Sequence, residues 1–382
     1  MKRKFALWVA VMLLAVTLAP AFAVSAQDVG GMDVSAPAAV LMDYTTGKVL
    51  YEKNSHEQRP CASITKVMTL VLVFEQIEAG NLTMEEELSA SAHASSMGGS
   101  DIWLTEGERM TVNDLLKATV VMSANDAAVV LAEAVSGSED AFVSKMNEKA
   151  AELGMADTIF KNCNGLDEDG HVTSAYDVAL MSRELMKYDK IYEYTTVWID
   201  YLRGGATQLV NTNKLIRTYN GITGLKTGTT SKAGSCISAT ATRDGLSLIS
   251  VILGAGNTDD RFRDATTLLD YGYANWSMVT PEVPEIPEAT VNGGMRGMVK
   301  AEAPAAPQLL MDSSQKGSVE SKVVMNVELR APIMAGDVIG KVEYYSGEEL
   351  LASVDIKAAE DVEEITFLSS LLYLLNGLLC PS

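Results

Sequence analysis

The sequence predicts an α+β fold, in which an antiparallel sheet with helices is followed by a small all-β domain and a C-terminal amphipathic helix. Three observations predict it. Strand-like runs enclose segments with a helical spacing of apolar residues, a proline-rich stretch follows them, and short alternating apolar runs come after that stretch. With 382 residues, the chain is long enough for a domain of about 250 residues and a smaller second one.

The first 26 residues have the layout of a secretory signal peptide. A cationic start, MKRK, is followed by an apolar run over residues 5–18, and small residues lead to a cleavage site that we predict after Ala26. An uncleaved anchor is the alternative, and it is disfavoured because the run is short for a bilayer and Pro20 follows it. We therefore expect an exported protein.

Charge and cysteine content exclude several classes of function. The formal charge is −20, which argues against nucleic acid as a partner, because phosphate binding needs clustered Lys and Arg. Without residues 1–26 the charge becomes −23, from 27 cations and 50 anions. The cysteines form no C-x-x-C pair, so zinc and thioredoxin-like chemistry have no support. We expect no metal and no cofactor. We expect buried free thiols and no structural disulfide among Cys61, Cys163, Cys236 and Cys380.

The first domain, predicted over residues 27–278, begins with a hairpin at 36–53, where strand-like runs flank a Thr-Thr-Gly turn. Over residues 65–78 the apolar residues recur at three and four, which predicts a helix with one buried face. A second hairpin, around an Arg-Asp-Gly turn, is predicted between residues 228 and 256. The same helical spacing predicts further helices at 112–122, 126–135, 141–153 and 175–186.

The composition changes twice beyond the first domain. PEVPEIPEATVNGG, residues 281–294, has the proline content of a stiff linker. Residues 298–359 contain short alternating runs, so we assign 279–359 to a small β-sandwich domain with its linker.

The tail, residues 360–382, is apolar except for one narrow helical arc. About fifteen residues of helix span only ~22 Å, which is less than the ~30 Å of a bilayer's hydrocarbon. We expect the tail to lie in the interface at the outer face of the cytoplasmic membrane. The alternative is a helix packed on the protein body or an oligomer contact.

Ser63 and Lys66 are three residues apart where the helix predicted at 65–78 begins, so both side chains lie on one face. A serine hydroxyl is a poor nucleophile until a base takes its proton, and lysine is such a base only if burial or another cation lowers its pKa. The spacing alone is weak evidence, because Ser313 and Lys316 repeat it in a polar stretch without a helical pattern.

Two more motifs accompany this pair. VVMSANDAAVV places Ser123 and Asn125 between two predicted helices, and ITGLKTGTTSKAG places Lys226, Thr227 and Gly228 at the head of a hairpin. Serine-x-x-lysine, serine-x-asparagine and lysine-threonine-glycine, in this order, are the signature of penicillin-binding proteins and class A β-lactamases. A capping serine or a turn glycine would explain each motif by itself, but not their coincidence.

The chain thus resembles the low-molecular-mass penicillin-binding proteins of the serine D-alanyl-D-alanine carboxypeptidase family. The resemblance covers nearly the whole chain, through RPCASITKVMT, SAND, LGM before TIFKNCNGLDEDGHVTSAYDVALM, TGLKTGTT and LISVILGAGNTDDRFRDATTLLDYGY. LRAPIMAGDVIGKVEYYSGEELLASV and the tail look like the family's second domain and membrane anchor. The resemblance implies a penicillin-binding/β-lactamase-like transpeptidase fold for the first domain. Cys61 and the absence of cations in the tail depart from the family pattern.

The resemblance implies that three residues are catalytic. Ser63 would be the acylated nucleophile, Lys66 its proton acceptor, and Ser123 a proton shuttle toward the leaving amine. Lys226 would lower the pKa of Lys66 and help to bind the terminal carboxylate of the substrate. The residues implied in substrate binding are Asn125, Lys226, Thr227, Gly228, Thr229 and Arg261, with Arg263 as a near alternative to the last. The backbone N–H groups of Ser63 and Thr229 would form the oxyanion hole.

The expected reaction is removal of the terminal D-alanine from peptidoglycan stem peptides through an ester on Ser63, with β-lactams as covalent inhibitors. A class A β-lactamase is one alternative, but no convincing glutamate-bearing loop lies between Asn162 and Lys226. A non-catalytic penicillin-sensing or wall-binding module is another, which leaves the intact reactive residues unexplained.

Other polar residues have simpler interpretations. The histidines, His56, His93 and His171, share no ligand spacing, so we expect no histidine-based triad. The acidic stretch DEDG at residues 167–170 lacks the spacing of a calcium loop and is predicted to be a solvated turn. Asp177 opens a predicted helix and is expected to support it locally.

Overall fold

The computed structural model describes residues 32–326, 328–368 and 370–371. The predicted signal peptide and most of the predicted amphipathic tail, including Cys380, lie outside these ranges, so both segments stay predictions. Within the described ranges, no helix combines the length and the apolar character needed to cross a membrane.

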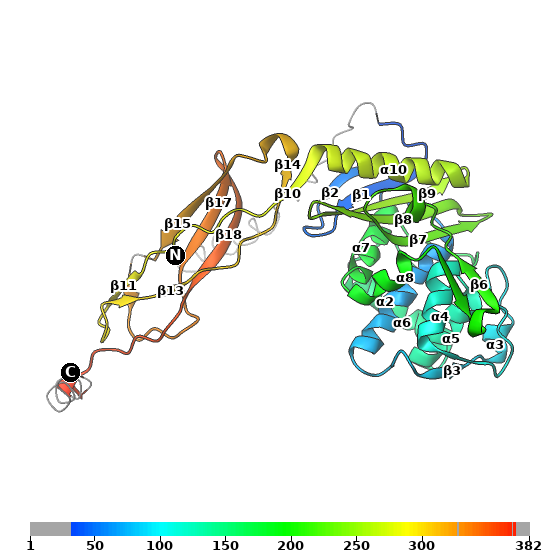
Figure 1. The fold of residues 1–382 in the computed structure, drawn as a ribbon, viewed down its shortest axis with the longest axis horizontal. Coiled ribbons are helices and arrows are strands. Elements are labelled where there is room, and N and C mark those ends of the chain that lie inside the picture. Colours follow the sequence, from blue (N-terminus) through cyan, green and yellow to red (C-terminus); the bar gives the residue numbers. More distant parts are fainter. Residues whose placement is uncertain (1–31, 327, 369, 372–382) are drawn as a thin grey trace, which may run out of the picture. The chain divides into compact units, whose positions relative to one another are not determined.

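A five-stranded sheet forms the centre of the first domain (Figure 1). Its order is β2 (Val49–Lys53), β1 (Ala38–Asp43), β9 (Leu246–Ala255), β8 (Gly234–Arg243) and β7 (Ile222–Thr230), and all neighbours are antiparallel. Both predicted hairpins are present, as β1–β2 and β8–β9. The predicted α+β fold class is therefore confirmed.

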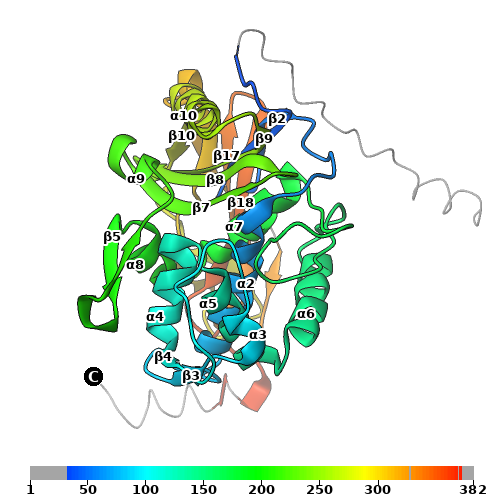
Figure 2. The same cartoon turned by 90° about the vertical axis from the view of Figure 1, so that its right-hand side faces the viewer.

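Helices cover both faces of this sheet. α10 (Thr258–Asn275) lies on one face, and α7 (Ala175–Leu185) lies on the other, beside α2 (Lys66–Glu78) (Figures 1 and 2). α5 (Asn125–Ser136) and α6 (Glu139–Glu152) complete this helical side, and its apolar side chains form one continuous core with the sheet. The core therefore holds the ends of α2, α5 and β7 close to one another.

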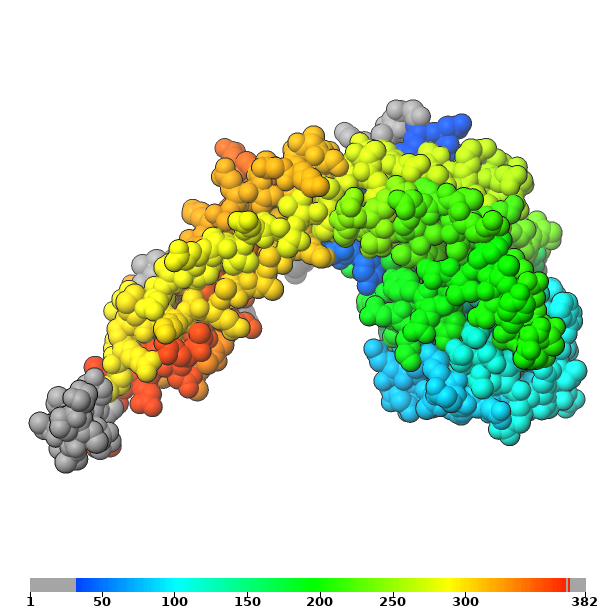
Figure 3. All heavy atoms as spheres, in the orientation of Figure 1, coloured from blue at the N-terminus to red at the C-terminus, as the bar shows by residue number. Residues whose placement is uncertain are grey.

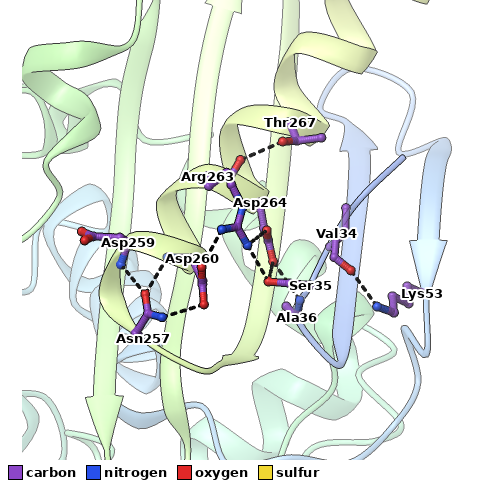
Figure 4. Close-up of polar contacts among 10 residues, drawn as sticks. All are labelled: Val34, Ser35, Ala36, Lys53, Asn257, Asp259, Asp260, Arg263, Asp264 and Thr267. Atoms are coloured by element: carbon purple, nitrogen blue, oxygen red, sulfur yellow. Dashed lines mark hydrogen bonds and ion pairs between the residues drawn. The ribbon is translucent and has the colours of Figure 1, made fainter. Parts of the chain in front are cut away.

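The segment before β1 lies against α10 (Figure 3) and is hydrogen-bonded to it (Figure 4). Ser35 Oγ and the backbone N–H of Ala36 donate to Asp264 Oδ2, at 2.9 and 2.8 Å. Asn257 caps α10, because its side chain accepts from the N–H groups of Asp259 and Asp260 (Figure 4).

The helix predicted at 112–122 differs from the structure in its second half. α4 (Val112–Lys117) is α-helical, but residues Ala118–Met122 form a π-helical turn. Ser123 follows with φ +68, in the left-handed region that ends the turn. A π turn widens the helix by one residue per turn without changing which residues are apolar, so the periodicity could not distinguish the two.

The strands that follow residue 288 form an all-β region with its own apolar core. One sheet has the order β13 (Ala301–Glu302), β18 (Glu349–Ala358), β17 (Val338–Ser346) and β15 (Val319–Met325). Another contains β12 (Met298–Val299), β11 (Ala289–Asn292) and β16 (Leu329–Arg330).

The predicted linker at 281–294 is partly wrong. Residues Ala289–Asn292 form β11, in which Ala289 and Val291 point into the core with 4% exposure each, while the alternate residues face outward. β10 (Trp276–Val279), just before the proline-rich stretch, pairs with β14 (Leu309–Asp312). The predicted boundary at residue 278 therefore falls inside a strand.

Candidate active site

Ser63 lies in a single 3₁₀ turn, Ala62–Thr65, that leads directly into α2. Ala62 has a φ of +51°, a strained value for a residue with a side chain. The turn is confined by two glycines, because a Cβ on Gly165 or on Gly228 would lie 2.9 Å from the backbone nitrogen of Ser63. The sequence thus places the hydroxyl on a tightly held turn at the start of a helix.

Lys66 is fully buried beside this serine. Its Nζ donates to Ser63 Oγ at 3.0 Å, to Asn125 Oδ1 at 2.6 Å and to the carbonyl of Asn164 at 2.7 Å. Burial lowers the pKa of Lys66 to about 7, although the neighbouring Cys163 and Asp101 oppose the shift. The amine is therefore partly neutral near neutral pH and able to accept a proton.

Lys226 enters the same buried cluster from β7. Its Nζ donates to Ser123 Oγ at 2.8 Å and to the carbonyl of Thr227 at 3.1 Å. Burial holds the pKa of Lys226 well below its usual value, and the charges of Lys66 and Arg261 lower it further. For Lys66, burial is likewise the cause that lowers the pKa, but Lys226 is not among the groups that shift it, so the lowering that we expected from Lys226 is not found.

Asn125 joins Lys66 to a neighbouring loop. It is the first residue of α5, and while its Oδ1 accepts from Lys66, its Nδ2 donates to the carbonyl of Gly98 at 2.6 Å. A Cβ on Gly99 would lie 2.9 Å from that amide nitrogen, so glycine permits the close approach. One hydrogen of the amide remains for another acceptor.

Arg261 reaches the far end of the cluster from α10. Its Nη1 donates to Thr229 Oγ1 at 2.8 Å and to the carbonyl of Gly228 at 3.1 Å. Its Nε is buried and makes no hydrogen bond to any described residue. Thr229 is exposed at the rim, whereas Thr227 is buried and donates to Thr212 Oγ1 at 2.6 Å.

Arg263 points elsewhere, although it is only two residues away. Its guanidinium donates to Asp260 at 2.6 Å and to Ser35 Oγ at 2.8 Å, beside the segment that precedes β1 (Figure 4). The structure thus brings together Ser63, Lys66, Ser123, Asn125, Lys226, Thr227, Gly228, Thr229 and Arg261, and it leaves Arg263 outside.

The family description "D-alanyl-D-alanine carboxypeptidase" matches residues 22–257, which is more than half of the chain. The chain belongs to the D-alanyl-D-alanine carboxypeptidase family. A second description, "Penicillin-binding protein 5, C-terminal domain", matches residues 284–364. The resemblance predicted from the motifs is therefore confirmed, and so is the all-β character of the second region.

Relatives cover almost the full length of this family member. D-alanyl-D-alanine carboxypeptidase DacF from Bacillus subtilis is 38% identical over 342 residues, which are 88% of each chain. The crystal structure of penicillin binding protein 5 from Haemophilus influenzae is similar with a TM-score of 0.75 and 29% identity, over 88% of this chain and all of that one. Penicillin-Binding Protein D2 from Listeria monocytogenes, in the ampicillin-bound form, matches with a TM-score of 0.59 and 34% identity, over 64% of this chain and 99% of that one.

The loop that follows Asn162 also belongs to the site of this carboxypeptidase family member, and the motifs missed it. The carbonyl of Asn164 holds Lys66, and Gly165, with φ +86°, packs against the serine turn. The stretch at 167–170 is exposed, as predicted for a solvated turn, but Asp167 is also hydrogen-bonded to Thr230 at the end of β7. One sign of the role of this loop was present in the sequence. The glycine in NCNGLD, Gly165, stands where no predicted turn calls for a glycine.

The histidines have local partners. His56 Nδ1 lies 2.8 Å from Asp157, and His93 Nε2 lies 2.6 Å from Glu139. His171 is buried, its Nε2 lies 2.8 Å from Thr65 Oγ1, and burial lowers its pKa to about 4, so it is neutral. All three support the fold locally.

Asp177 and the cysteines also have structural roles. Asp177 accepts from the N–H of Asp157 and from the hydroxyl of Thr158, which lie 20 and 19 residues earlier. It therefore joins α7 to a distant segment, and Ser174 caps the helix, so the expected local role was wrong. Cys61, Cys163 and Cys236 are buried free thiols, and burial raises the pKa of Cys61 to about 12, so it stays unreactive.

Proposed function

We propose that the protein is a serine D-Ala-D-Ala carboxypeptidase that releases the terminal D-alanine of peptidoglycan stem pentapeptides through an ester on Ser63. One observation carries the proposal. Lys66 is buried, its pKa is lowered to about 7, and its Nζ lies 3.0 Å from Ser63 Oγ. A neutral amine at this distance can take the hydroxyl proton as the oxygen attacks.

Acylation uses groups from the serine turn, from the start of α2 and from β7. Ser63 Oγ attacks the carbonyl carbon of the penultimate D-alanine, and Lys66 accepts the proton. The N–H groups of Ser63 and Thr229 stabilise the oxyanion that forms, and each such donor is typically worth ~3 kcal/mol. Ser123, held by Lys226 at 2.8 Å, passes a proton to the amine of the departing D-alanine.

The substrate presents a carboxylate, and the protein as a whole carries a charge of −20. Binding therefore depends on cations that are concentrated at the site. Lys226, Thr227, Thr229 and Arg261 receive the terminal carboxylate, and the buried Nε of Arg261 is a donor without a partner among the described residues. Asn125 Nδ2, which uses one hydrogen on Gly98, offers the other to the peptide backbone of the substrate.

Water then cleaves the ester and frees the shortened peptide, whereas a β-lactam acylates Ser63 and remains attached. Among the described residues, the glutamate of the neighbouring loop, Glu168, is exposed and bonds to Asn162 at 3.2 Å, so nothing favours a lactamase-like deacylation.

The deciding experiment combines covalent labelling with product release. Purified protein should bind a fluorescent penicillin and release D-alanine from a diacyl-D-Ala-D-Ala peptide, and Ser63→Ala should lose both activities. Labelling of Ser63→Ala would refute the choice of nucleophile. Penicillin binding without D-alanine release would favour a sensing module, and rapid turnover of nitrocefin would favour a lactamase.

We also propose that the mature protein is exported and that its tail attaches it to the outer face of the cytoplasmic membrane. The cationic and apolar start of the sequence and the amphipathic pattern of residues 360–382 support this location. Cell fractionation tests it: the full chain should sediment with membranes, and a chain that ends at residue 359 should not. Equal sedimentation would contradict the role of the tail.

A further inference from the structure

Residues 162–170 form a loop that touches the serine turn on one side. The carbonyl of Asn164 accepts from Lys66 Nζ at 2.7 Å. Gly165 lies so close to the turn that a Cβ there would be 2.9 Å from the backbone nitrogen of Ser63. The first half of the loop therefore holds both the nucleophile and its base.

The second half of the same loop holds the end of β7. Asp167 Oδ1 accepts from Thr230 Oγ1 at 2.6 Å, and Asp167 Oδ2 accepts from the N–H of Lys232 at 3.3 Å and from Ser231 Oγ at 3.4 Å. These donors directly follow Thr229, one of the two proposed oxyanion donors. A single carboxylate thus contacts three consecutive residues beyond that donor.

The separation of the two oxyanion donors depends on contacts between the serine turn and β7. Thr229 is flanked by Gly228, which packs against Ser63, and by Thr230, which bonds to Asp167. We propose that Asp167 is a positioning residue that fixes the end of β7 relative to the serine turn and so sets the geometry of the oxyanion hole. This inference rests on the proposed role of Ser63 as nucleophile.

A positioning role differs in its kinetics from a merely structural one. An oxyanion forms only in the transition state, so a displaced donor slows acylation but leaves the affinity of the non-covalent complex unchanged. If Asp167 only stabilised the loop, its removal would lower the melting temperature. The affinity of the non-covalent complex and the rate of acylation would then both stay unchanged.

The experiment uses the full chain and a fluorescent penicillin at several concentrations, so that the dissociation constant and the acylation rate constant are obtained separately. We expect Asp167→Ala to lower the rate constant about tenfold, which is less than loss of a whole donor, with the dissociation constant within about twofold. Asp167→Asn keeps an acceptor oxygen for Thr230 and should lose less.

Thr230 provides the reciprocal test. Thr230→Val removes the hydrogen bond to Asp167 and the acceptor of the Ala233 N–H, and Asp167→Ala removes that same bond and the longer contacts with Ser231 and Lys232. Both variants should acylate more slowly, and the double variant should lose less than the product of the two single effects, because the shared bond is removed only once. Thr230→Ser keeps the hydroxyl and should acylate like the parent protein. If Asp167→Ala does not fold, Thr230→Val carries the same test.

Asp169→Ala is the matched control, since Asp169 lies in the same loop, is 98% exposed and pairs with Lys232 Nζ at 2.8 Å. It should leave both constants unchanged. An unchanged acylation rate in Asp167→Ala, or a change in affinity alone, would overturn the inference. Failure of the proposed function looks different, because Ser63→Ala would then still be labelled.

Discussion

At the scale of single residues, the site depends on cations that the protein buries. Lys66, Lys226 and Arg261 are each at most 6% exposed, and burial lowers the pKa of all three. The motifs predicted which residues would gather, because the order of the motifs is specific. The resemblance implied Arg261 and left Arg263 as a near alternative; Arg261 contacts β7, because of how α10 is rotated against the sheet.

The lowered pKa of Lys66 predicts the pH dependence of acylation. In the proposed mechanism Ser63 needs a neutral base, so the rate of penicillin labelling should rise from pH 5 to pH 8 with a midpoint near the lysine pKa of about 7. The charge of Asp101 raises that pKa, so Asp101→Asn should move the midpoint to lower pH, by roughly 0.5 unit.

The control for this shift is Asp177→Asn, which removes another buried carboxylate that is not among the groups that shift the pKa of Lys66. Its midpoint should equal that of the parent protein. Rates measured between pH 5 and pH 9 check both variants. A midpoint that stays in place or rises in Asp101→Asn would contradict the charge argument.

The two arginines of α10 predict a contrast in substrate binding. Arg261→Ala should raise the KM for a diacyl-D-Ala-D-Ala peptide by about 10- to 100-fold, the range for a hydrogen bond to a charged group. Arg263→Ala should leave KM within about twofold, because its partners are Asp260, Ser35 and Asp264. The KM of each variant is measured from steady-state D-alanine release. Equal changes of KM in the two variants would contradict the assignment of Arg261 to substrate binding.

At the scale of elements, the apolar spacing predicted four of the helices well and the loop at 162–170 poorly. Helical periodicity is a local property, so α2, α5, α6 and α7 begin and end within two residues of their predicted limits. The π-helical turn after α4 and the helix α10 were not predicted. The contacts of the loop join residues far apart in sequence, such as Asn164 with Lys66 and Asp167 with Thr230. No local pattern contains that information.

Two glycines of this loop give a matched pair for testing its packing. Both have positive φ, +86° at Gly165 and +83° at Gly170, so alanine is strained at either position by about 1 kcal/mol. A Cβ on Gly165 would also overlap the carbonyl of Ala62, whereas one on Gly170 would meet only Lys161, at 3.5 Å.

Gly165→Ala should therefore slow acylation more than tenfold and lower the melting temperature, because the serine turn has to move. Gly170→Ala should lower the melting temperature slightly and keep the acylation rate. Thermal unfolding and penicillin labelling of the two proteins check this. Equal acylation rates would show that the turn tolerates the displacement.

At the scale of the whole molecule, every residue of the proposed site lies between Ser63 and Arg261. The chain beyond it forms separate sheets with their own core. The solved chain of the Listeria relative is matched over 99% of its length by 64% of this chain. Composition and proline content predicted the change of fold class near residue 280, but not the pairing of β10 with β14.

A chain of residues 27–278 should thus retain activity. We expect its D-alanine release from a small soluble peptide to be within about twofold of the full chain, with a lower melting temperature because β10 loses the backbone hydrogen bonds to β14. Activity on isolated cell-wall sacculi should fall if the second domain positions the site. Loss of activity on the soluble peptide would contradict the independence of the first domain.

The burial of the two lysines has a consequence for the alkaline side of the stability curve. In the unfolded chain Lys66 regains its ordinary pKa of 10.5, whereas the folded value is about 7, so between these values the unfolded state binds more protons. Unfolding consequently becomes less favourable as the solution turns more basic, and Lys226 acts in the same direction. The buried amine thus destabilises the fold by a constant amount below about pH 7, and this cost shrinks as the pH rises toward 10.5.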